Sequence, residues 1–123
     1  MVLFSINEIN EMLDDIVEEM PNELFRELNG GVSLLPETKL SAAAPDGGLY
    51  TLGEYRCDQM GRYIVLYYGS ICAVHYSDTR EELRADLKKL LAHELTHHME
   101  SLAGERGLEI EDKRKLDEYM RKK

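Results

Sequence analysis

The chain has few of the features that cross-link a small protein or anchor it in a membrane. Its 123 residues include two cysteines, three prolines and no tryptophan. Cys57 and Cys72 are too few for a disulfide framework and belong to no CxxC pair. Residues 1–8 hold neither a basic region nor a sustained apolar run, so we expect no signal peptide. No apolar stretch approaches the ~20 residues of a membrane-spanning helix. These absences predict a cytoplasmic protein with reduced thiols.

Positive charge is also scarce. Lys and Arg number 15 against 24 Asp and Glu, which gives a formal net charge of −9. Phosphate backbones and anionic lipids repel such a surface, so we expect neither nucleic acid nor a membrane as a partner. With 43% hydrophobic and 32% charged residues, the composition is that of one globular domain over residues 1–123. Composition leaves the oligomeric state open.

Hydrophobic spacing and turn residues predict helices at both ends of the chain and strands between them. A capping box, Ser5 with Glu8, opens an amphipathic helix that Pro21 ends or kinks, and a further helical piece reaches Leu28. We then expect a strand at 32–35, a loop at 36–48, and two strands at 49–56 and 62–68 that are joined by a turn at 58–61. A helix at 79–103, a turn at 104–107 and a helix at 109–122 should complete the chain. For residues 71–76 the pattern leaves helix and strand open.

The strongest functional signal lies near the end of the helix predicted over 79–103. His93-Glu94-Leu95-Thr96-His97 spells H-E-x-x-H. Histidines at i and i+4 lie one turn apart, about 6 Å along the helix axis, so both imidazoles can reach one metal ion. A Glu beside them can act as a base toward a water on that ion, which is the arrangement of zinc metalloproteases. An exposed turn with surface histidines is the simpler alternative, but Ala92 and Leu95 keep the motif close to apolar positions.

A catalytic zinc needs a third protein ligand beside the two histidines. A metzincin would have Gly at position 100 and His at position 103, where this chain has Glu100 and Ala103, so that class is excluded. Glu100 points past the metal unless the helix ends there, whereas residues 109–112 follow a turn and could fold back. The acidic candidates are Glu100, Glu105, Glu109, Glu111, Asp112, Asp117 and Glu118.

The run 64–69, the capped helix and His93–His98 resemble the small bacterial zincin-like metallopeptidases. The similarity covers residues 12–120 and is strongest over 62–98. It implies a minimal α+β zincin with an N-terminal helix, a small mixed sheet of about 3–4 strands, a long HExxH helix and a C-terminal helix. In that family the pattern H-E-x-x-H-x-x-G-x-x-D supplies an Asp as third ligand. Here the segment 99–111 intervenes; if it is an insertion, Asp112 takes that place, with Glu105, Glu109 and Glu111 as alternatives.

The resemblance also implies a function. We expect one Zn²⁺ per chain, held by His93, His97 and Asp112, and hydrolysis of a peptide or protein substrate by a zinc-bound water that Glu94 activates. Zincins bind substrate along an edge strand, and we expect strand 63–68 to be that edge. The alternative is a regulatory or partner-binding zinc module without proteolysis, and a third possibility is a non-peptidase hydrolase.

Four other side chains are assigned roles from the sequence. Tyr67 and Tyr68 are expected mainly as sheet residues, and they are also the substrate-binding candidates on that strand. His98 points about 100° away from His97, so we expect it to pack or hydrogen-bond locally. His75 lies outside the motif and is expected to be an exposed or hydrogen-bonded histidine, with a transition-state donor as the minority alternative.

Overall fold

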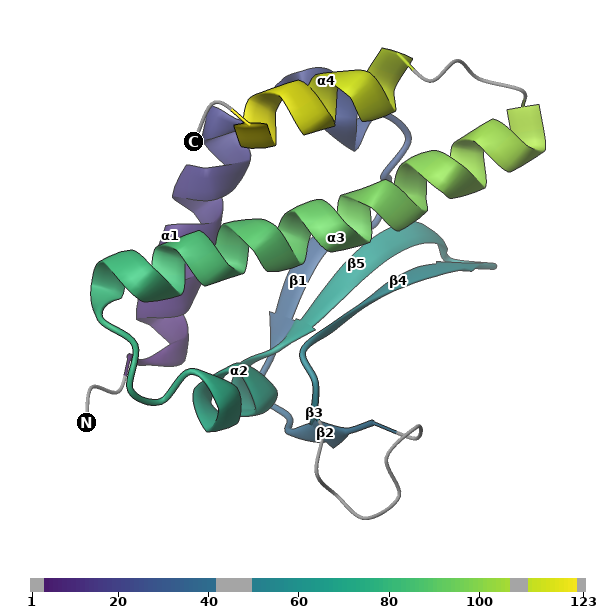
Figure 1. Ribbon diagram of the computed structural model, residues 1–123. Coiled ribbons are helices and arrows are strands. Elements are labelled where there is room, and N and C mark those ends of the chain that lie inside the picture. Colours follow the sequence, from purple (N-terminus) through teal and green to yellow (C-terminus); the bar gives the residue numbers. More distant parts are fainter. Residues whose placement is uncertain (1–3, 42–49, 107–110, 122–123) are drawn as a thin grey trace.

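The computed structural model describes residues 4–41, 50–106 and 111–121, and gives the backbone alone for 105–106 and 111–114. The helices are α1 (Ile6–Glu19), the 3-10 turn η1 (Asn22–Phe25), α2 (Tyr68–Val74), α3 (Arg80–Arg106) and α4 (Glu111–Arg121). The strands are β1 (Gly31–Leu35), β2 (Lys39–Leu40), β3 (Tyr50–Thr51), β4 (Gly53–Asp58) and β5 (Gly61–Tyr67). Helices packed on a small mixed sheet confirm the predicted α+β class (Figure 1).

The main sheet has β5 at its centre. Its strand order is β1-β5-β4, with β5 parallel to β1 and antiparallel to β4, while β2 and β3 form a separate two-stranded ribbon. The prediction of 63–68 as an edge strand is therefore wrong. The nearly continuous burial of β5 from Ile64 to Tyr67 is typical of a strand with a neighbour on each side. The edges of the described sheet are β1 and β4.

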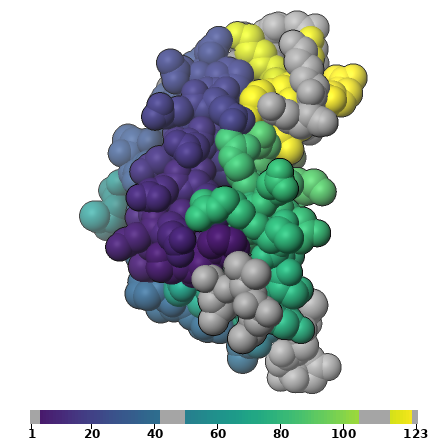
Figure 2. Space-filling view, turned by 90° about the vertical axis from the view of Figure 1, so that its left-hand side faces the viewer, coloured from purple at the N-terminus to yellow at the C-terminus, as the bar shows by residue number. Residues whose placement is uncertain are grey.

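Helices α1 and α3 cover one face of this sheet. Ile9 and Ile16 of α1, Ile64 and Leu66 of β5 and Leu91 of α3 belong to one buried apolar cluster. The space-filling view shows α1 beside α3, with α4 next to both at one end (Figure 2). Apolar spacing in the two long helices therefore builds the core, as the sequence predicts.

A glycine brings α3 close to the edge strand β4. Gly53 faces the core opposite Leu66 in the β4–β5 register. A Cβ on Gly53 would lie 2.6 Å from Cδ2 of Leu66 and 3.4 Å from Cδ1 of Leu90 on α3. The small residue therefore permits the helix to pack directly over this strand.

Several boundaries differ from the prediction. The strand expected over 49–56 is divided, because Tyr50–Thr51 pairs with Lys39–Leu40 of the predicted loop, and Gly53–Asp58 joins the main sheet. The undecided segment 71–76 is helical as far as Val74. Helix α3 continues past Gly104 to Arg106, so a turn starting at Gly104 is wrong, and the rest of that turn lies outside the described residues.

Two expectations drawn from absences can be compared with the structure. Cys57 and Cys72 are free cysteines. Over the described ranges, no helix combines the length and apolar character needed to cross a membrane.

Candidate metal centre

The H-E-x-x-H segment lies in the regular helix α3, as the sequence predicts. Thr79 and Glu82 form a reciprocal capping box at its start, with Glu82 Oε1 accepting from the Thr79 N–H and Thr79 Oγ1 accepting from the Glu82 N–H. The one-turn spacing brings the rings of His93 and His97 to 4.7 Å between centroids, nearly perpendicular to each other. Their Nε2 atoms are 3.2 Å apart.

This nitrogen–nitrogen distance suits a shared metal ion. Two ligands at tetrahedral positions around zinc, each with a Zn–N bond of about 2.0–2.1 Å, lie about 3.3–3.4 Å apart. Nδ1 of His97 is 3.4 Å from Oε1 of Glu100, which favours the proton on Nδ1 and leaves the Nε2 lone pair available. The two histidines therefore fit a zinc ion without rearrangement. Glu100 therefore contacts His97 at Nδ1, whereas Nε2 of His97 faces Nε2 of His93.

Glu94 is the buried acid of the site. The residue retains only 5% of its accessible surface. Burial raises the pKa of the Glu94 carboxyl, while the charges of His93 and His97 and a hydrogen bond to the Tyr55 backbone act in the opposite direction.

A shallow depression of about 490 Å³ lies over these three residues. Four consecutive residues of β4, Gly53–Arg56, form its other wall. The edge strand beside the motif is therefore β4, which replaces the predicted 63–68. An extended peptide laid along this edge would pass directly over His93 and His97.

The sequence did not indicate the charged residues of β4 as part of the site. Oε1 of Glu54 accepts hydrogen bonds from Arg56 Nη2 at 2.7 Å and from the Tyr67 hydroxyl at 2.9 Å, and Oε2 pairs with Lys39 at 2.5 Å. The Lys39 contact, followed by Arg56 and Tyr67, lowers the pKa of Glu54 to about 2 despite partial burial. Only the pairing of β4 with β5 brings these residues to the motif. A single-sequence pattern does not reveal that register.

The structure places the two tyrosine candidates outside the lining of the depression. Tyr67 is buried and reaches the site through its hydroxyl, which donates to Glu54 at 2.9 Å and accepts from Arg56 at 3.5 Å. Tyr68 begins α2, and its hydroxyl donates to the Phe4 carbonyl at 2.7 Å. Tyr67 is thus a supporting contact of a pocket residue, and Tyr68 fastens the start of α1 to the end of the sheet.

His98 has the local role predicted for it. The ring is almost fully buried, with Nδ1 at 2.9 Å from the Tyr55 hydroxyl and Nε2 at 2.7 Å from the Arg26 carbonyl. Both ring nitrogens are occupied within the protein. His75 lies apart from the depression, beside Asp78 and Asp86.

Most of the acidic candidates for the third metal ligand have side chains that the structure does not describe. For Glu105, Glu111 and Asp112 only the backbone is described, and Glu109 lies outside the described residues. Asp117 and Glu118 are exposed on α4. Helix α3 runs on to Arg106, more than two turns past His97, so an acid beyond it must return toward the site.

Comparisons with known proteins identify the family to which the chain belongs. The family model described as zincin-like metallopeptidase matches residues 11–118. A solved structure of a conserved hypothetical protein from T. thermophilus is similar, with 32% identity and a TM-score of 0.67 over 82% of this chain and 99% of that one. No curated protein matches the chain significantly. The chain belongs to the zincin-like metallopeptidase family.

Proposed function

We propose that the chain is a zinc-dependent peptidase. His93 and His97 would hold the ion. The third ligand would be an acid near the end of α3 or beyond it, with Asp112 preferred and Glu105, Glu109 and Glu111 as alternatives. The observation that supports this most directly is the 3.2 Å approach of the two Nε2 atoms beside the buried Glu94. Family membership supports the zinc assignment. The two free thiols suit a cytoplasmic location.

When bound, zinc would lower the pKa of a coordinated water and polarise the substrate carbonyl. The chain's own residues supply the proton transfer and the positioning. Glu94 takes a proton from the attacking water and returns it to the leaving amine, so no free hydroxide or amide anion is needed. In the described sheet, the outer edge of β4 would hold the peptide extended above the motif helix through backbone N–H and C=O groups other than those of Tyr55, whose backbone already bonds Glu94.

The charged pair Glu54 and Arg56 borders the same edge. Arg56 keeps 45% of its side chain exposed, whereas Glu54 is held by Lys39, Arg56 and Tyr67. Arg56 bonds Glu54 through Nε and Nη2, and its exposed guanidinium is the group on β4 that could also pair with a substrate carboxylate. We expect a preference for acidic residues in the bound peptide.

The shallow depression also suits a second candidate, a zinc module that binds a partner without cleaving it. Among the described residues its lining comes from β4 and α3, and these two elements alone leave few walls for deep side-chain pockets. A protein that loads zinc through His93 but cleaves no peptide would have this function.

Metal content and peptide cleavage separate the candidates. Protein purified without a metal-affinity tag is analysed for zinc and incubated with a peptide library, as wild type, His93→Ala, Glu94→Gln and Glu81→Gln. Glu81 is exposed on the same helix, so its variant controls for the lost charge. A peptidase loses zinc in His93→Ala, keeps zinc but loses at least ~100-fold activity in Glu94→Gln, and is unchanged in Glu81→Gln. Zinc content independent of His93 would contradict the metal site, and cleavage unaffected by Glu94→Gln would contradict the mechanism.

A further inference from the structure

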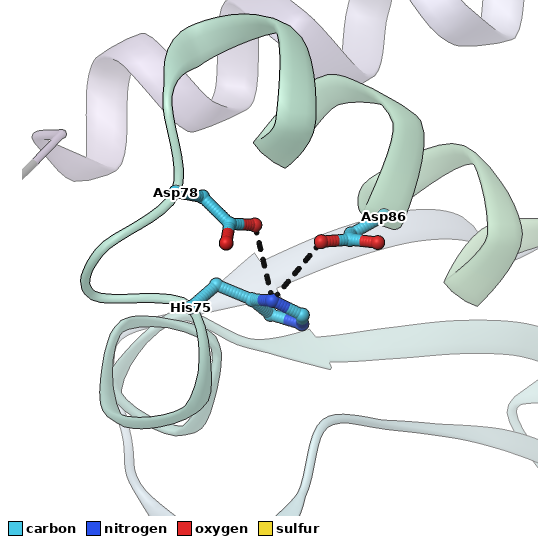
Figure 3. A group of neighbouring side chains, drawn as sticks. All are labelled: His75, Asp78 and Asp86. Atoms are coloured by element: carbon cyan, nitrogen blue, oxygen red, sulfur yellow. Dashed lines mark ion pairs between the residues drawn. The ribbon is translucent and has the colours of Figure 1, made fainter.

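A second group of metal-ligand side chains lies where α2 ends and α3 begins. His75, Asp78 and Asp86 point toward one another, and their nearest ligand atoms all lie within 4.8 Å (Figure 3). Nδ1 of His75 is 3.1 Å from Oδ2 of Asp78 and 3.2 Å from Oδ2 of Asp86. A single imidazole nitrogen thus faces two carboxylates at once.

The local backbone fixes this arrangement. His75 caps the C-terminus of α2, and its N–H donates to the Ile71 carbonyl at 2.8 Å. The Asp78 N–H donates to the His75 carbonyl at 3.1 Å, which closes a tight turn between the two residues. Asp86 comes from the second turn of α3. A helix C-cap, a hydrogen-bonded turn and a helix position therefore bring the three side chains together before any ligand binds.

Charge within the group is unbalanced without a cation. Nδ1 of an imidazole carries at most one hydrogen, so it cannot donate a full hydrogen bond to both carboxylates. The buried Oδ2 of Asp78 makes no well-aligned hydrogen bond among the described residues, and its ion-pair contact, Nδ1 of His75 at 3.1 Å, is shared with Asp86. Two converging carboxylates with one buried oxygen unsatisfied are what a bound cation would neutralise.

The donor set and the spacing indicate which cation. One imidazole nitrogen and two carboxylate oxygens suit zinc and similar divalent ions, with bonds of about 2.0–2.2 Å. Neighbouring ligands of such an ion lie about 3.3–3.5 Å apart at tetrahedral angles, close to the two distances observed here. The side chains of His75, Asp78 and Asp86 retain 22%, 18% and 33% exposure, so water can complete the coordination. We propose that His75, Asp78 and Asp86 form a second binding site for a divalent transition-metal ion.

This site is distinct from the H-E-x-x-H centre. Asp86 precedes His93 on the same helix by two turns, a rise of about 10 Å. The metals of a two-metal catalytic site are only about 3.5–4 Å apart, so the two centres cannot share a substrate atom. The second ion would instead join the end of α2 to the second turn of α3. Its effect should be on stability, because binding to the folded state alone stabilises that state.

Metal titration of single-site and double-site variants tests the proposal. The protein is stripped with chelator, titrated with Zn²⁺ and in parallel with Co²⁺, and its melting temperature is recorded. We expect two ions per wild-type chain, one in His93→Ala, one in Asp86→Asn and none in the double variant. In the His93→Ala background, Asp86→Asn should weaken binding by at least about 100-fold, because it removes a direct ligand. Glu81→Gln removes the same charge from an exposed position of α3 and should still bind two.

The possible outcomes separate the two centres. One ion per wild-type chain, lost in His93→Ala and kept in Asp86→Asn, would overturn the second site and leave the peptidase proposal intact. One ion lost in Asp86→Asn and kept in His93→Ala would support the second site and contradict the first. If Asp86→Asn does not fold, Asp78→Asn takes its place, and unchanged binding in that variant would overturn the proposal.

Discussion

The hydroxyl of Tyr55 on β4 lies 2.9 Å from Nδ1 of His98 on α3. Nε2 of the same ring lies 2.7 Å from the carbonyl of Arg26, just after η1. A carbonyl only accepts, so Nε2 carries a proton, and the neutral ring accepts the Tyr55 hydroxyl at Nδ1. His98 therefore links the edge strand of the depression, the motif helix and the segment after η1.

Replacing His98 with leucine should destabilise the fold. His98→Leu leaves the Arg26 carbonyl and the Tyr55 hydroxyl without this partner in a part-buried setting. We expect a loss of about 2–4 kcal/mol in the free energy of unfolding, measured by urea denaturation. Tyr55→Phe removes only the hydroxyl and should cost about 1 kcal/mol. A His98→Leu protein as stable as wild type would show that the ring does not connect these elements.

The sequence was sufficient wherever function depends on spacing within one element. The positions of His93, Glu94 and His97 follow from one helical turn, and the different direction of His98 follows from the next residue on that helix. Residues that reach the site only through the pairing of strands could not be predicted in this way. Glu54 and Arg56 enter the site only because β4 lies beside β5 and under α3, and the hydrophobic run of β5 indicated a strand without indicating its neighbours. The Asp86 contact with His75 likewise depends on how α2 turns into α3.

Acid should remove a contribution of Glu19 to stability. Its carboxylate bonds the Tyr119 hydroxyl at 2.9 Å, Lys88 at 3.1 Å and Arg84, and these contacts lower the pKa of Glu19 to about 2. A carboxyl whose pKa is lowered in the folded state stabilises that state above the unfolded pKa of about 4.3, and this stabilisation is lost as pH falls toward 2. The side chain is 38% exposed, so solvent screening reduces the effect to about 1 kcal/mol.

The measurement is the urea midpoint of wild type and Glu19→Gln between pH 7 and pH 2. The wild type should be the more stable by about 1 kcal/mol at pH 7, and the two curves should converge below pH 4. Glu18→Gln removes the same charge one position earlier and serves as the control. A difference between wild type and Glu19→Gln that stays constant over this range would mean that the three contacts are not formed in solution.

Gly104 distinguishes a helix that continues from one that ends. In the structure it is an exposed residue inside α3, and a Cβ there would meet nothing within 4 Å. Gly104→Ala should therefore stabilise the protein by about 0.5–1 kcal/mol, because alanine is the better helix former and restricts the unfolded chain. A helix that stopped at Gly104 with a left-handed cap, as the sequence alone suggests, would be destabilised by the same change.

Gly61→Ala gives the matched contrast, since Gly61 has φ +107° and a Cβ would lie 2.9 Å from Oδ1 of Asn29. Thermal melts should move in opposite directions for the two variants, and a lower melting temperature for Gly104→Ala would place the end of the motif helix before Arg106.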